Sequence, residues 1–168
     1  GRTLAVTGAA GAMGGYVVQL AKAEGLRVIA DAAPADEALV HALGADLVVP
    51  RGHGFADSVR GLVPEGADGL VDGALLNELA VPAVADGGRI VTVRGYEGPA
   101  ASTRGITFFP VFVRSYAREQ DKLDRLREQA EDGTVTLRVA RTLPAAEAAE
   151  AHRLLEAGGV RGRLVLEF

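Results

Sequence analysis

The chain has 168 residues, of which 48% are hydrophobic and 24% are charged, and its formal net charge is −4. This composition is typical of a globular protein with one well-buried domain and at most a small appendage. The acidic balance argues against a nucleic acid or an anionic membrane as partner. The sequence has no cysteine, which excludes disulfides, a cysteine nucleophile and thiolate-bound zinc within it. We find no membrane-spanning apolar run and no signal peptide, so we expect a cytoplasmic protein.

Short apolar runs alternate with helical patterns over the first 95 residues. Such runs are typical of parallel strands that are buried on both faces. The repetition predicts an α/β protein with a Rossmann-type, doubly wound parallel sheet. The expected strands span residues 3–7, 27–30, 46–49, 69–71 and 89–93, and the expected helices span 12–24, 35–43, 55–62 and 75–85.

The pattern changes after Gly95. Residues 96–104 predict a surface loop, and 106–113 predict a sixth strand that Pro110 restricts to an edge of the sheet. A helix is expected over 115–131, with Leu123, Leu126 and Ala130 as its buried stripe. The remaining elements form a short C-terminal β-α-β appendage, with strands over 135–139 and 163–167 and a helix over 144–157. We therefore divide the chain into a dinucleotide-binding domain, 1–133, and a C-terminal segment, 134–168.

The most informative stretch is Leu-Ala-Val-Thr-Gly-Ala-Ala-Gly-Ala-Met-Gly at residues 4–14, where a strand leads through glycines into a helix. That context is what a dinucleotide-binding fingerprint requires. Gly8 permits a tight turn, Gly11 lets the backbone approach a pyrophosphate, and Gly14 lets the helix pack closely on the strand. The start of the helix then presents free N–H groups to the phosphates.

A second part of the fingerprint is an acidic residue after the second strand, about 20 residues beyond the glycines. Asp31 occupies this place, where a carboxylate binds both hydroxyls of the adenosine ribose of NAD and repels the 2′-phosphate of NADP. The alternative is a solvated loop aspartate that caps the next helix. Arg51, after the third strand, is the nearest cation in sequence that could lie along the adenine or reach a 2′-phosphate.

Several further motifs occur in a fixed order along the whole chain. With the stretch at 6–14, they resemble the cofactor domain of zinc-independent medium-chain dehydrogenase/reductases, in the branch of the quinone oxidoreductases and enoyl reductases. The matching motifs are Gln-Leu-Ala-Lys at 19–22, Leu-Gly-Ala-Asp at 43–46, Asp-Gly-Gly-Arg-Ile-Val at 86–91, Ala-Ala-Glu-Ala-His-Arg-Leu-Leu-Glu at 148–156 and Arg-Gly-Arg-Leu-Val-Leu at 161–166.

The resemblance implies an N-terminal GroES-like catalytic domain, which this sequence does not contain, and makes 134–168 a return segment that completes that domain. It also implies a homodimer formed through the edge of the sixth strand. NADPH is the usual cofactor of the family, whereas Asp31 argues for NADH. The implied cofactor contacts are Ala10, Gly11, Ala12 and Met13 at the pyrophosphate, Arg51 on the adenine side, and Val93, Arg94, Gly95, Phe112 and Val113 at the nicotinamide. Arg94 departs from the family pattern, in which Val-Gly follows the fifth strand.

The sequence shows no acid–base constellation and no metal site, because its three histidines, at 41, 53 and 152, are scattered. Asp68 and Asp72 flank the fourth strand, and their spacing would point both to the same face of the sheet. Terminal hydrogen bonding is their expected role. We expect an NAD(P)H-binding domain of an oxidoreductase that transfers hydride to an enone, a quinone or an enoyl thioester, inactive without its catalytic domain. The alternatives are a non-catalytic nucleotide-binding or interaction module, and the enoyl reductase part of a multidomain synthase. Because the strand at 163–167 would normally pair within the catalytic domain, we also expect self-association through a sheet edge.

Overall fold

The structure is a computed structural model that describes residues 1–99 and 104–168. Residues 100–103 of the predicted loop at 96–104 lie outside the described residues. The chain divides into two compact units, Gly1–Val135 and Thr136–Phe168. In the part of the chain that the structure describes, no helix is long and apolar enough to cross a membrane.

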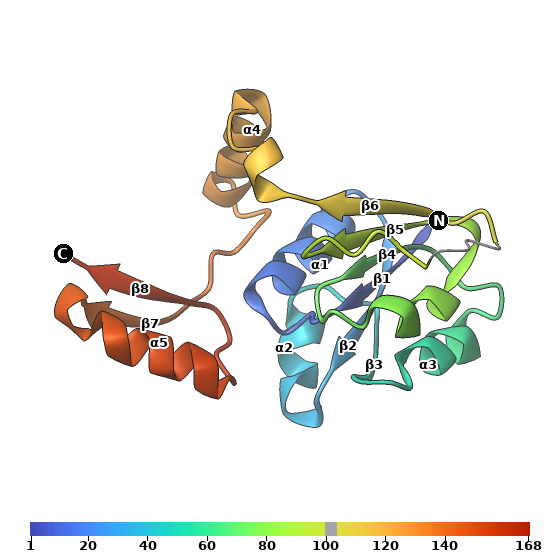
Figure 1. The fold of residues 1–168 in the computed structure, drawn as a ribbon, viewed down its shortest axis with the longest axis horizontal. Coiled ribbons are helices and arrows are strands. Elements are labelled where there is room, and N and C mark those ends of the chain that lie inside the picture. Colours follow the sequence, from blue (N-terminus) through green and yellow to red (C-terminus); the bar gives the residue numbers. More distant parts are fainter. Residues whose placement is uncertain (100–103) are drawn as a thin grey trace. The chain divides into compact units, whose positions relative to one another are not determined.

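The first unit contains a six-stranded parallel sheet with the order β3-β2-β1-β4-β5-β6 (Figure 1). This confirms the predicted Rossmann-type fold. The direction of winding reverses between β1 and β4, which is the point where such sheets bind ligands at their carboxyl edge. The strands are β1 (Thr3–Thr7), β2 (Arg27–Ala32), β3 (Leu47–Pro50), β4 (Ala67–Asp72), β5 (Val84–Val93) and β6 (Thr107–Val111).

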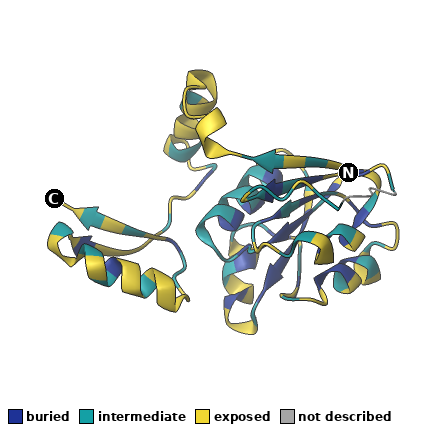
Figure 2. Ribbon diagram, in the orientation of Figure 1, coloured by how far each residue is buried: buried dark blue, intermediate teal, exposed yellow. Residues whose placement is uncertain are grey.

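Helices cover both faces of the sheet, because successive strand residues are apolar and point to opposite faces. On one face, Val6 and Val28 pack with α1 (Ala12–Ala23) and α2 (Glu37–Ala42). On the other, Ala5 and Ile29 pack with α3 (Phe55–Leu62). The central strands β1 and β2 are accordingly mostly buried, as the dark blue in Figure 2 shows.

The helix predicted over 75–85 is wrong. The segment forms two 3₁₀ helices, η2 (Asn77–Leu79) and η3 (Val81–Ala83), and β5 already begins at Val84. Leu75 and Asn77 have φ values of 60° and 52°, which interrupt a right-handed helix, and Pro82 lacks an N–H group.

Two arginines satisfy the carbonyl groups of this irregular segment. Arg60 donates from Nε to the Pro82 carbonyl at 2.7 Å and from Nη2 to the Val84 carbonyl at 2.9 Å. Arg104 donates from Nη2 to the Val81 carbonyl at 2.8 Å. The side chains replace the hydrogen bonds that an α-helix would supply.

The predicted helix at 115–131 begins later, after the 3₁₀ turn η4 (Val113–Ser115), and α4 spans Gln120–Glu131. Its predicted buried stripe is also wrong, because Leu123 and Leu126 are 41% and 50% exposed. Figure 2 shows most of α4 in the colour of exposed residues. Among the described residues, α4 is tied to the domain by an ion pair between Arg125 and Glu24, with 2.7 Å between Nη2 and Oε1.

The second unit contains β7 (Val139–Pro144), the 3₁₀ turn η5 (Ala145–Glu147), α5 (Ala148–Ala157) and β8 (Arg163–Glu167). The strand predicted over 135–139 is wrong, since β7 starts only at Val139. β8 is not left without a partner, because it pairs in parallel with β7. Leu143 and Ala151 are buried in this unit, and the sheet therefore has a small core of its own.

Candidate functional site

The loop between β1 and α1 has the geometry that its glycines predict. Gly8 has a φ of +69°, which only glycine adopts without strain, and its carbonyl accepts a hydrogen bond from the Gly11 N–H at 3.0 Å. Gly11 is the N-cap of α1, and neither a capping side chain nor an acidic residue occupies the first turn. The start of α1 is therefore suited to an anion.

Gly14 is required by close packing between α1 and this loop. A Cβ atom on Gly14 would lie 2.2 Å from the Gly8 carbonyl oxygen, and one on Gly11 would lie 3.1 Å from the same atom. The loop after β4 is equally close, because a Cβ atom on Gly73 would lie 2.7 Å from Cε of Met13. These glycines bring the loops after β1 and β4 together at the carboxyl edge of the sheet.

Asp31 lies inside β2, which continues two residues beyond its predicted end. It is 3% exposed, and its Oδ1 accepts a hydrogen bond from the Ala9 N–H at 3.0 Å. Burial raises the pKa of the Asp31 carboxyl group, whereas the Ala9 and Gly8 amides and the charge of Arg51 act in the opposite direction. The alternative of a solvated helix-capping aspartate is therefore wrong, and the carboxyl group lies against the glycine loop.

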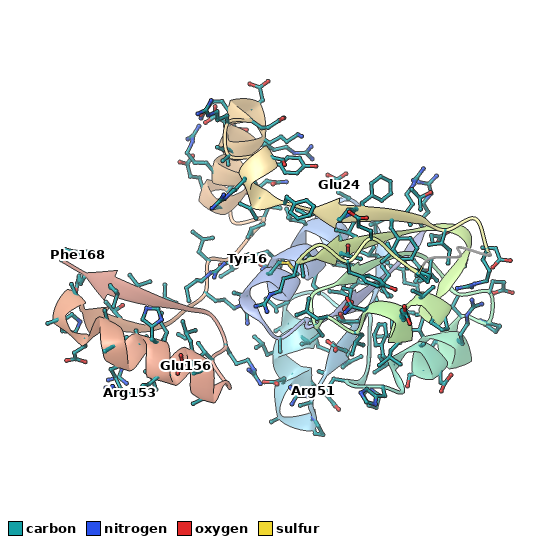
Figure 3. The ribbon with its side chains drawn as sticks, viewed as in Figure 1. Tyr16, Glu24, Arg51, Arg153, Glu156 and Phe168 are labelled. Atoms are coloured by element: carbon teal, nitrogen blue, oxygen red, sulfur yellow. The ribbon has the colours of Figure 1, made fainter. Side chains whose placement is uncertain are left out.

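Arg51 follows β3 and is exposed (Figure 3). Its N–H donates to the Ala32 carbonyl at 3.2 Å, which fixes the chain at the end of β2. The charge of Arg51 lowers the pKa of the Asp31 carboxyl group, against the effect of burial. The assignment of both residues to the adenosine end of a cofactor site stays a prediction.

A buried polar pair joins the ends of β1 and β4, where the winding reverses. The Thr7 hydroxyl donates to Oδ1 of Asp72 at 2.6 Å and accepts from the Ala74 N–H at 3.1 Å. Asp72 also accepts from the N–H groups of Leu76 and Asn77, at 3.1 and 2.7 Å. The expected hydrogen-bonding role of Asp72 is confirmed. The part played by Thr7 was missed, although a threonine at the end of a buried strand is a usable signal.

The residues predicted to lie at the nicotinamide come from the ends of β5 and β6. Arg94 and Gly95 follow β5 with φ values of 58° and 80°. A Cβ atom on Gly95 would lie 3.6 Å from Cζ of Phe112, so the structure brings these two predicted residues together. Phe112 and Val113 are 52% and 79% exposed, while Val93 is half-buried at the end of β5.

A model of the zinc-binding dehydrogenase family matches residues 43–166, which make up most of the chain. The chain belongs to the zinc-binding dehydrogenase family. This membership, together with the fold, confirms the resemblance to the NAD(P)-binding domain of medium-chain dehydrogenase/reductases that the sequence motifs carry.

Solved structures of this type match the chain over nearly its whole length. A structure described as AibC is 32% identical, with a TM-score of 0.85, and the match covers 99% of this chain and 52% of that one. An NAD-dependent alcohol dehydrogenase is 34% identical, with a TM-score of 0.83 and coverages of 100% and 51%. A quinone oxidoreductase from Pseudomonas syringae pv. tomato DC3000 shares the fold at 22% identity, with a TM-score of 0.83 and coverages of 99% and 56%. The chain thus spans about half the length of these proteins.

The family's description implies zinc, but the residues present do not fit a zinc site. Zinc in proteins is held by cysteine, histidine and carboxylate side chains. The sequence has no cysteine, and His41, His53 and His152 are all exposed. Among residues 1–99 and 104–168, no group of three or more histidines and carboxylates could hold a metal ion.

Proposed function

We propose that this chain is the NAD(P)H-binding part of an oxidoreductase, with the dinucleotide bound across the carboxyl edge of the sheet. The observation that carries the proposal is the contact between the Asp31 carboxyl group and the Ala9 amide. It places an acidic group beside the glycine loop, at the head of an α1 helix that no side chain caps. A diphosphate and a ribose are the two ligand groups that such a pair of features suits.

The residues of the loop and the strand ends have distinct proposed roles. The backbone at Gly8, Ala10, Gly11, Ala12 and Met13 would hold the pyrophosphate, which Gly14 permits by close packing. Asp31 would accept hydrogen bonds from the adenosine ribose, and Arg51 would lie along the adenine. The bound dinucleotide would supply the hydride, while Val93, Gly95, Phe112 and Val113 would orient the nicotinamide and exclude water.

NADH is the proposed cofactor in preference to NADPH. A 2′-phosphate at the adenosine ribose would meet the buried Asp31 carboxyl group, and an anion next to a carboxylate is unfavourable. The family likeness includes an NAD-dependent alcohol dehydrogenase, which is in keeping with this preference. Arg51 is the group that could reverse it, because its guanidinium is exposed near Asp31.

The proposed reaction is hydride transfer to an enone, a quinone or an enoyl thioester. In this proposal, residues 134–168 are the return segment of a catalytic domain, and the 168-residue chain alone does not turn over substrate. The chain covers about half of the solved structures it matches, which is consistent with a cofactor half that depends on other residues for its substrate cleft.

Calorimetric titration of the 168-residue chain with NADH and with NADPH tests the proposal. We expect NADH to bind at least as tightly as NADPH, and Asp31→Asn to weaken NADH binding about tenfold, because a charge-assisted hydrogen bond is lost. Asp57→Asn, an exposed change on α3, is the control. If neither NADH nor NADPH binds, the proposal is refuted. If NADPH binds clearly more tightly than NADH, the proposed role of Asp31 is refuted. Oxidation of NADH by a quinone with this chain alone would contradict its dependence on a further domain.

We also propose that the chain forms a homodimer through the edge of β6. β6 is the last strand of the sheet, so one side of its backbone has no neighbouring strand within residues 1–99 and 104–168. Phe109 on this strand is 45% exposed, and Tyr116 beyond it is also 45% exposed. Exposed aromatic side chains beside an open strand edge favour pairing with a second copy.

A further inference from the structure

The turn after β5 places a cation in a conformation that an arginine rarely adopts. Arg94 has a φ of 58°, in the left-handed region that favours glycine. The neighbouring Gly95 accepts a φ of 80° without strain, so the local backbone does not need an arginine at position 94. A residue kept in such a backbone conformation is a candidate for a functional role.

Both ends of this turn are held in place. The hydroxyl group of Thr92, which is 1% exposed, donates to the Tyr96 carbonyl at 2.5 Å. The Tyr96 ring packs edge-on against Phe108, with 6.0 Å between the ring centroids and 85° between the planes. The backbone conformation of Arg94 is therefore fixed by the contacts of Thr92 and Tyr96 on either side of it, and not by the intrinsic φ preference of arginine.

The Arg94 guanidinium is available to a ligand. Arg94 is exposed, and it makes no hydrogen bond or ion pair with any of the residues 1–99 and 104–168. Glu97 is the nearest carboxylate along the turn, and the structure shows no ion pair between the two. In contrast, Arg60, Arg104 and Arg125 all donate to partners within the chain.

The location of Arg94 selects the kind of ligand. β5 lies beyond β4 on the side of the switch point away from β2 and Asp31, which is the half that the nicotinamide occupies in the proposed function. Next to Arg94, Gly95 faces the half-exposed ring of Phe112. An exposed cation one residue from the contact between Gly95 and Phe112 suits a molecule that has an anionic group on an apolar stem.

We propose that Arg94 is a specificity-determining residue that binds a carboxylate on the substrate that accepts the hydride, and that Phe112 packs against its apolar stem. This inference rests on the proposed function, because it places the nicotinamide beside the turn. It narrows the substrate class from enones, quinones and enoyl thioesters in general to unsaturated acceptors that carry a carboxylate.

A pair of probes with the same carbon skeleton, one anionic and one neutral, tests this assignment. Crotonate and crotonamide have the same carbon skeleton, and calorimetry gives their affinities for the NADH-loaded chain. We expect crotonate to bind about tenfold more tightly than crotonamide, since one charged hydrogen-bonding partner is involved. Arg94→Gln and Arg94→Gly should abolish the difference, and Arg94→Lys should retain part of it. Arg118→Gln removes the same charge from an exposed position outside the turn and should leave the difference unchanged.

Arg94→Gly separates a structural role from a binding role. Glycine relieves the left-handed strain, so the thermal midpoint should rise while the preference for crotonate disappears. Equal binding of crotonate and crotonamide by the unmodified chain, or binding of neither, overturns the assignment. A loss of NADH affinity in Arg94→Gln as large as the loss of crotonate affinity also overturns it, because the cofactor diphosphate is then the anion that Arg94 holds. Failure of the unmodified chain to bind NADH is seen before any acid is added, and it refutes the proposed function itself.

Discussion

The two halves of the sheet differ in whether their polar side chains have hydrogen-bond partners within the chain and whether their large side chains are buried. In the half formed by β1, β2 and β3, the Asp31 carboxyl group contacts the Ala9 amide, and Thr7 contacts Asp72 at the junction with β4. In the half formed by β4, β5 and β6, Arg94 is exposed in a left-handed turn and Phe109 is 45% exposed. The polar groups of the first half thus have partners within the chain, whereas Arg94 and Phe109 in the second half are open to solvent.

This difference has a physical basis in the sheet order. β1, β2, β4 and β5 each have a strand on both sides, whereas β6 is the outer strand of its half. Buried polar groups such as Asp72 must find partners within the chain, because an unpaired buried group is costly. Exposed groups beyond β5 can form hydrogen bonds with water, so they need no partner within the chain and are accessible to ligands.

The largest expected effect concerns Gly14, whose replacement would disrupt the first half. In Gly14→Ala the new methyl group would lie 2.2 Å from the Gly8 carbonyl oxygen, which is backbone and cannot turn aside. We expect a loss of about 3 kcal/mol in the free energy of unfolding and loss of NADH binding. Chemical denaturation and calorimetry measure the two effects.

Gly61→Ala is the matched control for this change. Gly61 lies in α3, and a Cβ atom there meets nothing within 4 Å. We expect this variant to be stabilised by about 0.5–1 kcal/mol through helix propensity, with unchanged NADH affinity. If Gly14→Ala keeps its stability and NADH affinity as Gly61→Ala does, the conformation of the loop does not depend on close packing at Gly14.

The next largest effect is expected at Asp72. Asp72→Ala leaves the Thr7 hydroxyl and the Leu76 and Asn77 amides without their buried acceptor. We expect a loss of about 2–4 kcal/mol in stability, measured by denaturant unfolding. The control Asp68→Ala removes an exposed carboxylate that accepts one hydrogen bond, from the Thr3 N–H at 2.7 Å, and should cost about 1 kcal/mol. Equal losses of stability in the two variants would show that the burial of Asp72 does not make its hydrogen bonds more important for folding.

The sequence predicted the order of the elements and the glycine loop in the first half of the sheet, because these signals are local. The glycines of the first loop indicate a specific backbone geometry, which the φ of Gly8 and the packing of Gly14 show. The spacing from the glycines alone predicted that Asp31 follows the second strand at the position of the acidic residue of the fingerprint. Its burial and its hydrogen bond to Ala9 depend on the neighbouring strand, and spacing does not report them.

The failures lie where non-local contacts decide the structure. The helix predicted over 75–85 has a helical composition, but Arg60 and Arg104, both distant in sequence, stabilise 3₁₀ turns there instead. The stripe of α4 has helical periodicity, and periodicity indicates an apolar face without showing what covers it. Leu126 is accordingly half exposed.

A pH titration sharpens the role of Asp31 in the first half. Burial raises the pKa of its carboxyl group, so the group binds a proton more tightly in the folded state than in the unfolded state. Its contribution to stability is therefore most favourable at low pH and is lost as the pH rises through the raised pKa. The proposed contact with the ribose needs the carboxylate form of Asp31, so NADH affinity should fall as the pH is lowered.

We expect NADH affinity to fall about tenfold as the pH is lowered through this pKa, and to start falling above the usual aspartate range near about 3.9. Calorimetry across that range measures the change. Asp31→Asn should bind NADH more weakly at neutral pH and lose this pH dependence. A variant that keeps the pH dependence would assign it to another group.

The smallest effect on stability is expected at the surface of the second half, where two adjacent aromatic residues offer a direct comparison. Phe108 packs against the buried core and Tyr96, whereas Phe109, one residue on, points to the opposite side of β6 and is 45% exposed. At a protein concentration low enough to hold the chain monomeric, Phe109→Ser should change the free energy of unfolding by less than about 0.5 kcal/mol. Phe108→Ser should cost about 2 kcal/mol through lost packing.

The same pair of variants tests the proposed dimer, because Phe109 matters only if a second copy covers it. Light scattering at rising concentration should show the unmodified chain and Arg118→Gln associating, and Phe109→Ser remaining monomeric to at least about tenfold higher concentration, since the dimer would lose two buried rings. A strict monomer at high concentration contradicts the dimer but leaves the small stability effect of Phe109→Ser in place. A large stability loss in dilute Phe109→Ser would instead mean that the chain itself covers this face, and the contrast between the two halves of the sheet would then not hold.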